Sequence, residues 1–292
     1  MSTARVLPSI SVRRAKPEDA PECGRICYEA FAAINAAHGF PPDLPEPGRA
    51  VGLISRNFSH PGFYCVVAEH DGRVAGSNCM DERSAIAGIG PITVDPTVQN
   101  ARVGRALMDA VLERARERRF AGVRLVQAAF HNRSLSLYTK LGFDTREPLA
   151  CMQGTPPGTR FEGCRVRAAR ETDLDACSAV CREVHGHDRA GDVAEAIREG
   201  SARVVERGGR ITGYTSALAF FGHTVGESNL DVQALIAAVE EFGGPGFLIP
   251  TRNAALFRWC LESGLRVVQP MTLMSLGLYN EPKGAWLSSI LF

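Results

Sequence analysis

The sequence lacks a long apolar run, a basic tract and an excess of either charge. No apolar run in its 292 residues approaches the roughly 20 that a membrane-spanning helix needs. Its first residues contain no apolar core of a secretory signal. The net charge is +1, and no long basic tract that would favour a nucleic acid is present. We therefore expect a cytoplasmic protein with no membrane or nucleic-acid partner.

The cysteines do not form the pattern of a disulfide framework. Their number, nine, is odd, and the chain is long enough to build a core without such bonds. Cys23 and Cys27 are four residues apart, and so are Cys177 and Cys181. Four thiolates could hold zinc if the pairs met, but this spacing more often marks the core face of a helix. The histidines of the run at 185–188 are too tightly spaced for strong evidence of a metal site, so we expect none.

The hydrophobic pattern predicts a chain that contains both strands and helices. The Asp71-Gly72 pair predicts a hairpin turn. The strand at 85–94 has few charges, so we expect it to be buried on both faces. The expected strands are 10–15, 63–69, 74–80, 85–94, 124–128 and an edge strand from 143. One helix is expected to start at 17, and three more are expected at 49–57, 102–119 and 133–141.

The chain then repeats itself after a segment rich in glycine and proline. The run that begins at Val166 resembles the run at Val12, and at the same offset each copy has its cysteine pair. Near the other end Asn253, Trp259 and Gly264 echo an earlier asparagine, tyrosine and glycine, with one extra residue before the glycine. We interpret this as a tandem duplication. The predicted domains are 1–153 and 164–292, joined by a linker at 154–163, and the second copy is expected to hold a hairpin of 203–206 with 211–221 and a helix at 230–242.

The stretch from Gly88 to Phe143 contains the pattern with most chemical content. A buried strand ends at Val94, and a polar loop from Gln99 to Gly104 then opens a helix. This order places several backbone N–H groups at a helix N-terminus, where an anion can be held. We therefore expect a phosphate-bearing ligand between two neighbouring strands.

The residues of this stretch resemble a known family. The loop Gln99-Asn100-Ala101-Arg102-Val103-Gly104 resembles the acyl-CoA loop of GNAT acetyltransferases, whose pattern is Q/R-x-x-G-x-G/A. Asn132, Tyr138 and Gly142-Phe143 resemble the N-x(5)-Y-x(3)-G-F segment of the same family. The resemblance covers about residues 10–153, with 165–280 as a worn copy. It implies the α/β (α+β) class, with two tandem GNAT-like domains, each a mixed, mostly antiparallel sheet flanked by helices. It also implies an acetyl-CoA-dependent N-acetyltransferase, in which a primary amine of a small molecule or peptide attacks the thioester directly.

The resemblance assigns roles to particular residues. Backbone N–H groups of 100–105 would hold the pyrophosphate of CoA, and the N–H of Val94 would stabilise the oxyanion. Asn132 would hold the pantetheine arm, and Tyr138 would protonate the departing thiolate as general acid; otherwise Tyr138 is an ordinary core tyrosine. The expected cofactor-binding residues are Ile92, Thr93, Val94, Gln99, Asn100, Ala101, Arg102, Val103, Gly104, Arg105, Asn132 and Tyr138.

Two departures from the family pattern bear on activity. Arg102 stands where the family has glycine, which tolerates unusual backbone angles. If its φ is helical, Arg102 fits and adds a phosphate contact; if not, affinity for the cofactor drops. Residues 85–94 contain no carboxylate to serve as general base. The nearest candidates are Asp81, Glu82 and His131, of which we rank His131 first, and an amine that arrives neutral or a water chain needs no base.

The second copy lacks the loop pattern. It reads His223-Thr224-Val225-Gly226-Glu227-Ser228 at this place, and Trp259 replaces the acid. We expect a structural or substrate-shaping half. The alternative function for the whole chain is a non-catalytic acyl-CoA-binding regulatory module. The apolar run at 286–292 must pack on the chain or form an interface, which leaves a homodimer open.

Overall fold

The computed structural model describes residues 10–291, which form two compact units. The first unit contains residues 10–81 and 89–119, and the second contains residues 82–88 and 120–291. The division falls inside strand β4 (Ile86–Val94), whose first three residues belong to the second unit. Residues 154–163 contain no helix or strand. The domain boundaries expected at this segment stay a prediction.

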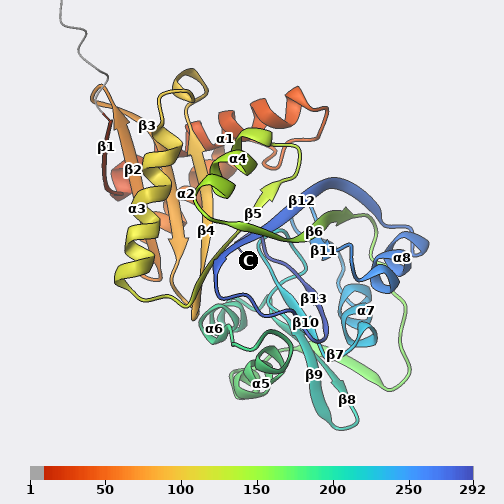
Figure 1. The fold of residues 1–292 in the computed structure, drawn as a ribbon. Helices are drawn as coiled ribbons and strands as arrows, with labels where there is room; N and C mark the ends of the chain where they lie inside the picture. The colour runs from red at the N-terminus through yellow and green to blue at the C-terminus, as the bar shows by residue number, and fades with distance from the viewer. Residues whose placement is uncertain (1–9, 292) are drawn as a thin grey trace, which may run out of the picture. The chain divides into compact units, whose positions relative to one another are not determined.

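The first unit is a sheet with helices on both faces (Figure 1). Its strands follow the order β1-β2-β3-β4, with β1, β2 and β3 antiparallel. The elements are β1 (Ile10–Arg14), η1 (Pro17–Asp19), α1 (Ala20–Ala37), α2 (Pro47–Ser59), β2 (Phe63–His70), β3 (Arg73–Asp81), the end of β4, η2 (Pro96–Val98) and α3 (Val103–Glu117).

Alternation along β2 and β3 decides which helix covers which face. Val67 packs in one apolar cluster with Cys23 and Cys27 of α1, all three fully buried. On the opposite face the amide of Asn78 donates to the carbonyl of Leu107 in α3, at 3.4 Å. Because successive strand residues point to opposite faces, α1 and α3 cover different sides of this sheet. The expectation that this cysteine spacing marks the core face of a helix is confirmed for α1.

Cys65 and Cys79 form a disulfide between β2 and β3. They are directly opposite each other in the antiparallel register. This bond is not predicted by the sequence, because the spacing of two cysteines does not reveal which strand residues will face each other.

The second unit contains two sheets (Figure 1). One follows the order β4-β5-β12-β6-β11 and the other β13-β10-β9-β8-β7. The elements are β5 (Gly122–Ala128), α4 (Asn132–Lys140), β6 (Asp144–Gln153), β7 (Cys164–Ala168), η3 (Glu171–Asp173), α5 (Leu174–His185), α6 (Ala190–Arg198), β8 (Arg203–Arg207), β9 (Arg210–Thr215), β10 (Thr224–Gly226), α7 (Asn229–Ala237), β11 (Phe247–Pro250), α8 (Ala254–Glu262), β12 (Arg266–Gly277) and β13 (Ala285–Leu287).

Two antiparallel strand pairs of the second unit mirror each other. Ala128 of β5 pairs with Met271 of β12, and Pro250 of β11 pairs with Leu149 of β6. The members of each pairing correspond at a constant separation of 122 residues. The last strand of each copy thus completes the sheet of the other copy. The expectation that the strand from 143 is an edge strand is therefore wrong, because β6 lies between β12 and β11.

An ion-pair network is built in the same way in both copies. Arg13 donates from Nε to Glu69 at 2.7 Å and from its two Nη atoms to the two oxygens of Asp19, at 2.7 and 2.8 Å. The counterparts make the same contacts through the same atoms, and they are Arg167, Glu206 and Asp173. This repeated geometry confirms the duplication that the sequence predicts.

Some expected elements are shorter in the structure. The strand predicted to reach 221 ends at Thr215, after which the chain turns and Ser216 donates its N–H to the carbonyl of His223 at 2.9 Å. The helix predicted to reach 242 ends at Ala237. The apolar C-terminal run packs within the second unit, where Trp286 of β13 is 6% exposed. None of the helices within residues 10–291 is long and apolar enough to cross a membrane.

Candidate functional site

The loop between β4 and α3 is ordered by its own polar contacts. Asp95 begins it and accepts hydrogen bonds from the N–H and the hydroxyl of Thr97, at 2.9 and 2.6 Å. Its own N–H donates to the carbonyl of Ala75 on β3 at 2.9 Å. The short helix η2 follows, and the N–H of Ala101 closes a turn onto Val98 at 3.0 Å. These contacts fix the direction in which the chain enters α3.

Arg102 adopts the left-handed backbone conformation that glycine favours. Its φ is 65° and its ψ is 10°, and it is the N-cap residue of α3. For a residue with a Cβ this conformation costs roughly 1–2 kcal/mol. Of the two cases that the sequence left open, the structure therefore shows the non-helical one. Arg102 keeps the loop shape that a glycine would give and adds local strain.

The N-terminus of α3 is suited to an anion. The first four N–H groups of a helix have no partner within the helix, and the helix dipole adds positive charge there. Within residues 10–291, the Arg102 side chain places no capping hydrogen bond on α3, and the first turn contains no acidic residue. Gly104 and Arg105 lie in this first turn, and Arg105 is ion-paired with Asp109 at 2.9 Å on the exposed side.

The second copy has lost this loop. Glu227 donates its N–H to Thr212 at 2.9 Å, as Asp95 does to Ala75, which identifies corresponding points of the two copies. In the first copy the segment 95–102 lies between this point and the start of α3. In the second copy only the segment 227–228 lies between the corresponding point and the start of α7. The segment 227–228 leaves no room for a loop of the family pattern.

A carboxylate of the chain itself occupies the N-terminus of α7. Asp231 is fully buried and accepts hydrogen bonds from the N–H and the hydroxyl of Ser228, at 3.0 and 2.6 Å. Thr212 at 2.5 Å and Arg207 at 3.1 and 3.2 Å donate to it as well. Burial raises the pKa of Asp231, but the hydrogen bonds from Arg207, Ser228 and Thr212 outweigh it and lower that pKa below the usual value. The place of an anion is thus already taken in this copy.

The end of β4 carries the three strand residues of the predicted site. Ile92 and Val94 are half-buried, and Thr93 between them is 3% exposed. A Cβ on Gly76 would lie 2.3 Å from the carbonyl oxygen of Thr93, so β3 needs glycine there to let β4 approach. The parallel ladder of β4 with β5 ends at Gly88.

Tyr138 is a buried residue of α4. It is 5% exposed, and burial raises the pKa of its hydroxyl to about 12, although a hydrogen bond with Ser134 acts in the opposite direction. The hydroxyl therefore keeps its proton near pH 7, as a general acid must. Asn132 is the first residue of α4 and is exposed.

His131 caps the same helix. Its Nδ1 accepts a hydrogen bond from the N–H of Ser134 at 3.1 Å. With Nδ1 as the acceptor, the neutral ring carries its proton on Nε2. A second proton would have to bind Nδ1, and this would break the hydrogen bond that caps the helix. His131 thus has a structural task, and its role as general base stays a prediction.

The predicted site residues fall into two groups by unit. The strand and loop residues from Ile92 to Arg105 belong to the first unit, whereas His131, Asn132 and Tyr138 belong to the second. Of the other two base candidates, Asp81 is in the first unit and Glu82 in the second. The roles of all these residues stay predictions.

The structure corrects the alignment of the two copies at this helix. Asn253 caps α8 by accepting from the N–H of Leu256 at 3.3 Å, as His131 caps α4. Asn253 thus corresponds to His131 and not to Asn132, and the extra residue before the glycine disappears. At the same separation of 122 residues Cys260, and not Trp259, stands in the place of Tyr138.

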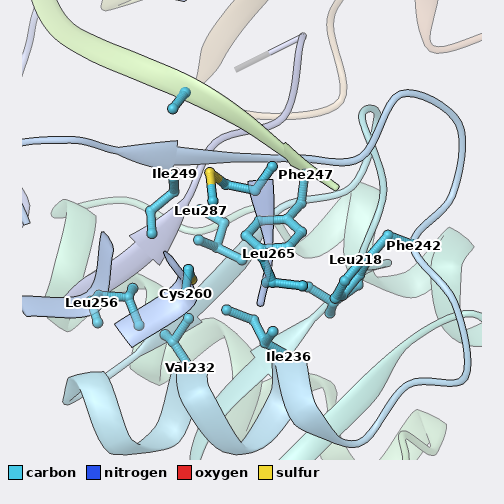
Figure 2. Close-up of a cluster of buried hydrophobic side chains, with 13 residues drawn as sticks. Leu218, Val232, Ile236, Phe242, Phe247, Ile249, Leu256, Cys260, Leu265 and Leu287 are labelled. Atoms are coloured by element: carbon cyan, nitrogen blue, oxygen red, sulfur yellow. The ribbon is translucent and has the colours of Figure 1, made fainter. Parts of the chain in front are cut away.

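The corrected alignment reveals a residue that the motif does not contain. Ser134, the hydrogen-bond partner of Tyr138, corresponds to Leu256 of the second copy. Leu256 and Cys260 both belong to an apolar cluster, shown in Figure 2. A comparison of the copies at this separation would have identified Ser134 from the sequence.

No metal site is visible within residues 10–291, because no three side chains of His, Cys, Asp or Glu are grouped to hold an ion. Cys177 and Cys181 of α5 lie in an apolar cluster, as Cys23 and Cys27 of α1 do. Burial lowers the pKa of His187 to about 4, so this ring is neutral near pH 7.

Comparisons with known proteins agree with the resemblance. Residues 28–143 match the family model described as Acetyltransferase (GNAT) family. No curated protein matches the chain. The chain is similar in structure to an acetyltransferase of unproven activity from Pyrococcus horikoshii, with 19% identity, a TM-score of 0.73 and 94% of each chain covered.

Two further solved structures share the fold over most of their length. A GCN5-related N-acetyltransferase from Sphaerobacter thermophilus is 17% identical with a TM-score of 0.61, and the match covers 93% of this chain and 96% of that chain. A tandem GNAT protein from the clavulanic acid biosynthesis pathway is 14% identical with a TM-score of 0.54, covering 92% of this chain and 98% of its own. The expected fold, two tandem GNAT-like domains of mixed α/β structure, is therefore confirmed.

Proposed function

We propose that this chain, whose residues 28–143 belong to the GNAT acetyltransferase family, is an acetyl-CoA-dependent N-acetyltransferase that acts on a primary amine of a small molecule or peptide. The observation that carries the proposal is the start of α3. It combines the loop pattern of the family with a helix N-terminus that no acidic side chain of the first turn occupies in the described structure.

The residues around this helix fit the pyrophosphate of acetyl-CoA. Backbone N–H groups at 100–105 offer several donors to one anion, and the dipole of α3 favours negative charge beside them. Arg102 is exposed beside this loop, but its left-handed backbone is the case in which we expect a lower affinity for the cofactor, and the charge of Arg105 is balanced by Asp109. The N-terminus of α7 fails the same test, because the carboxylate of Asp231 already accepts from the N–H and the hydroxyl of its N-cap residue, Ser228.

Acetyl-CoA supplies the acetyl group as a thioester, and the chain orients it and moves protons. The amine nitrogen forms a bond to the thioester carbon, and the carbon–sulfur bond then breaks to release CoA. In this proposal the N–H of Val94 stabilises the negative charge on the thioester oxygen. Tyr138 gives its proton to the departing sulfur, and burial keeps that proton on the hydroxyl until then.

The amine must lose a proton, and the structure offers no carboxylate on residues 85–94 for this purpose. His131 can take the proton only if its bond to the N–H of Ser134 is rearranged. We therefore propose that the acceptor enters as a neutral amine or loses its proton through water, with His131 as the nearest side-chain alternative.

The test is release of CoA thiol from acetyl-CoA in the presence of a panel of primary amines and short peptides. Turnover that depends on an amine, with the acetylated amine identified by mass spectrometry, supports the proposal. Binding of acetyl-CoA without amine-dependent thiol release contradicts it and favours the non-catalytic acyl-CoA-binding module.

A further inference from the structure

Gln127 of β5 is a buried polar side chain that the site described so far does not use. It is 6% exposed. Within the described residues, neither its amide nitrogen nor its amide oxygen has a hydrogen-bond partner. A buried polar group left unpaired is costly, so native structures rarely keep one without a reason. Both ends of this carboxamide are therefore available to a ligand.

The face of β5 that carries Gln127 is the face toward the end of α4. Val123 points to the same side, because residues four apart on a strand share a face. It pairs directly with Leu276 of β12. A Cβ on Gly142, which follows α4, would lie 3.3 Å from the Cδ1 of Leu276. Gln127 thus shares the face against which the helix of Tyr138 ends.

The second copy shows that the fold needs no polar side chain at this position. The counterpart of Gln127, at the separation of 122 residues, is Ile249 of β11. Ile249 is fully buried and points into the apolar cluster of Figure 2. The same replacement of polar by apolar occurs at two more positions. The three polar residues are Gln127, Ser134 and Tyr138, and their counterparts, all in that cluster, are Ile249, Leu256 and Cys260.

We propose that Gln127 is a specificity-determining residue that binds the acyl acceptor. Its carboxamide offers two N–H donors and one acceptor oxygen, and it carries no charge. The matching ligand group is a neutral one that both donates and accepts, above all an amide near the reacting amine. This assignment rests on the proposed function. The pantetheine arm of acetyl-CoA also contains amides, so the experiment must separate the two ligands.

Arg124 on the same strand does not serve this face. It is three residues from Gln127 and therefore points to the opposite side of the sheet. There its guanidinium lies 5.0 Å from the ring centre of Tyr279. Its positive charge thus does not make the Gln127 side a site for an anion, which favours a neutral amide group as the ligand.

The test compares Gln127→Leu with the wild-type chain in three measurements. Thermal and urea unfolding report whether the carboxamide serves the fold. The dissociation constant of acetyl-CoA reports contact with the cofactor arm. Amine-dependent kinetics, on acceptor amines with and without a neighbouring amide, report contact with the acceptor. Ile249→Leu is the matched control, because it alters the corresponding site of the second copy.

We expect Gln127→Leu to fold with equal or higher stability, because it removes two unpaired polar atoms from a buried place. We expect kcat/KM for the amide-bearing acceptor to fall about 100-fold, and much less for the plain amine, with acetyl-CoA affinity unchanged within about twofold. Ile249→Leu should leave both kinetic readouts unchanged.

Each other outcome overturns the assignment in its own way. Loss of stability in Gln127→Leu shows that the carboxamide serves the fold. An equal loss for both amines together with weaker acetyl-CoA binding shows that it binds the cofactor arm. Unchanged kinetics show that it binds neither ligand. If the wild-type chain itself acetylates no amine, the proposed function fails first, which is distinct from all these results.

Discussion

Cys260 occupies in α8 the place that Tyr138 occupies in α4. The carbonyl of Tyr138 accepts from the N–H of Phe143 at 3.0 Å, and the carbonyl of Cys260 accepts from the N–H of Leu265 at 3.1 Å. The backbones are thus equivalent, and only the side chains differ. Burial raises the pKa of the Cys260 thiol to about 12, so it is inert in an apolar cluster. One copy of the duplicated helix therefore keeps a protonated hydroxyl, and the other keeps a thiol in an apolar cluster.

The first prediction concerns Tyr138. In Tyr138→Phe we expect turnover to fall about 100-fold or more, because the departing thiolate loses its proton donor. Acetyl-CoA affinity should stay unchanged, since the ring remains in place. The measurements are steady-state thiol release and calorimetry. Cys260→Ala is the control and should leave turnover intact, whereas full turnover in Tyr138→Phe would show that the acid is another group.

The second prediction concerns Arg102. In Arg102→Gly we expect stability to rise by up to about 1 kcal/mol, because glycine relieves the left-handed backbone but also makes the unfolded chain more flexible. Urea unfolding measures this change. Arg105→Gly, in the helical first turn of α3, should instead lower stability by about 1 kcal/mol. A loss of stability in Arg102→Gly would contradict the strain that we assign to this residue.

The third prediction concerns acid stability. Burial lowers the pKa of both His187 and His223 to about 4, against an ordinary value of about 6.5 in the unfolded chain. Between pH 6.5 and pH 4 the unfolded chain binds more protons, so stability falls as the pH falls through this window. Each ring accounts for a loss of about 3 kcal/mol at most in the free energy of unfolding.

Urea unfolding between pH 7.5 and pH 5 measures this dependence. Asp192 lies 2.9 Å from Nδ1 of His223 and favours its protonation, while burial and Arg189 oppose it. Replacement of His187 by Gln should flatten the pH dependence, whereas His38→Gln, at the exposed C-terminal end of α1, should not. A stability that is flat down to pH 5 would show that these rings are not buried neutral.

Local patterns predicted much of the fold. The apolar spacing of Cys23 and Cys27 correctly indicated the core face of α1, and the Asp71-Gly72 pair correctly placed the hairpin of β2 and β3. The edge position expected for β6 was wrong, because its second neighbour, β11, comes from about 100 residues further along the chain. Such pairings depend on how sheets close and leave no local signal.

The site was predictable where a motif fixes the backbone. The family pattern has glycine at position 102 and so predicts an unusual backbone conformation there. The structure confirms this, because Arg102 is left-handed. The two asparagines Asn132 and Asn253 suggest an alignment of the copies that is wrong by one residue. Helix capping needs only a suitable acceptor atom, so Nδ1 of His131 and Oδ1 of Asn253 serve the same purpose. Gln127 and Ser134 were missed, because a single polar residue in a strand or helix carries no pattern.

The central claim is that one copy keeps an acyl-CoA site, whereas the other has none because it lacks the loop before its helix α7, whether or not Asp231 is charged. Calorimetric titration of the full chain with acetyl-CoA tests it most directly. We predict one binding event per chain, which Asp231→Asn leaves at one. Two sites per chain, or no binding at high micromolar concentration, would contradict the account.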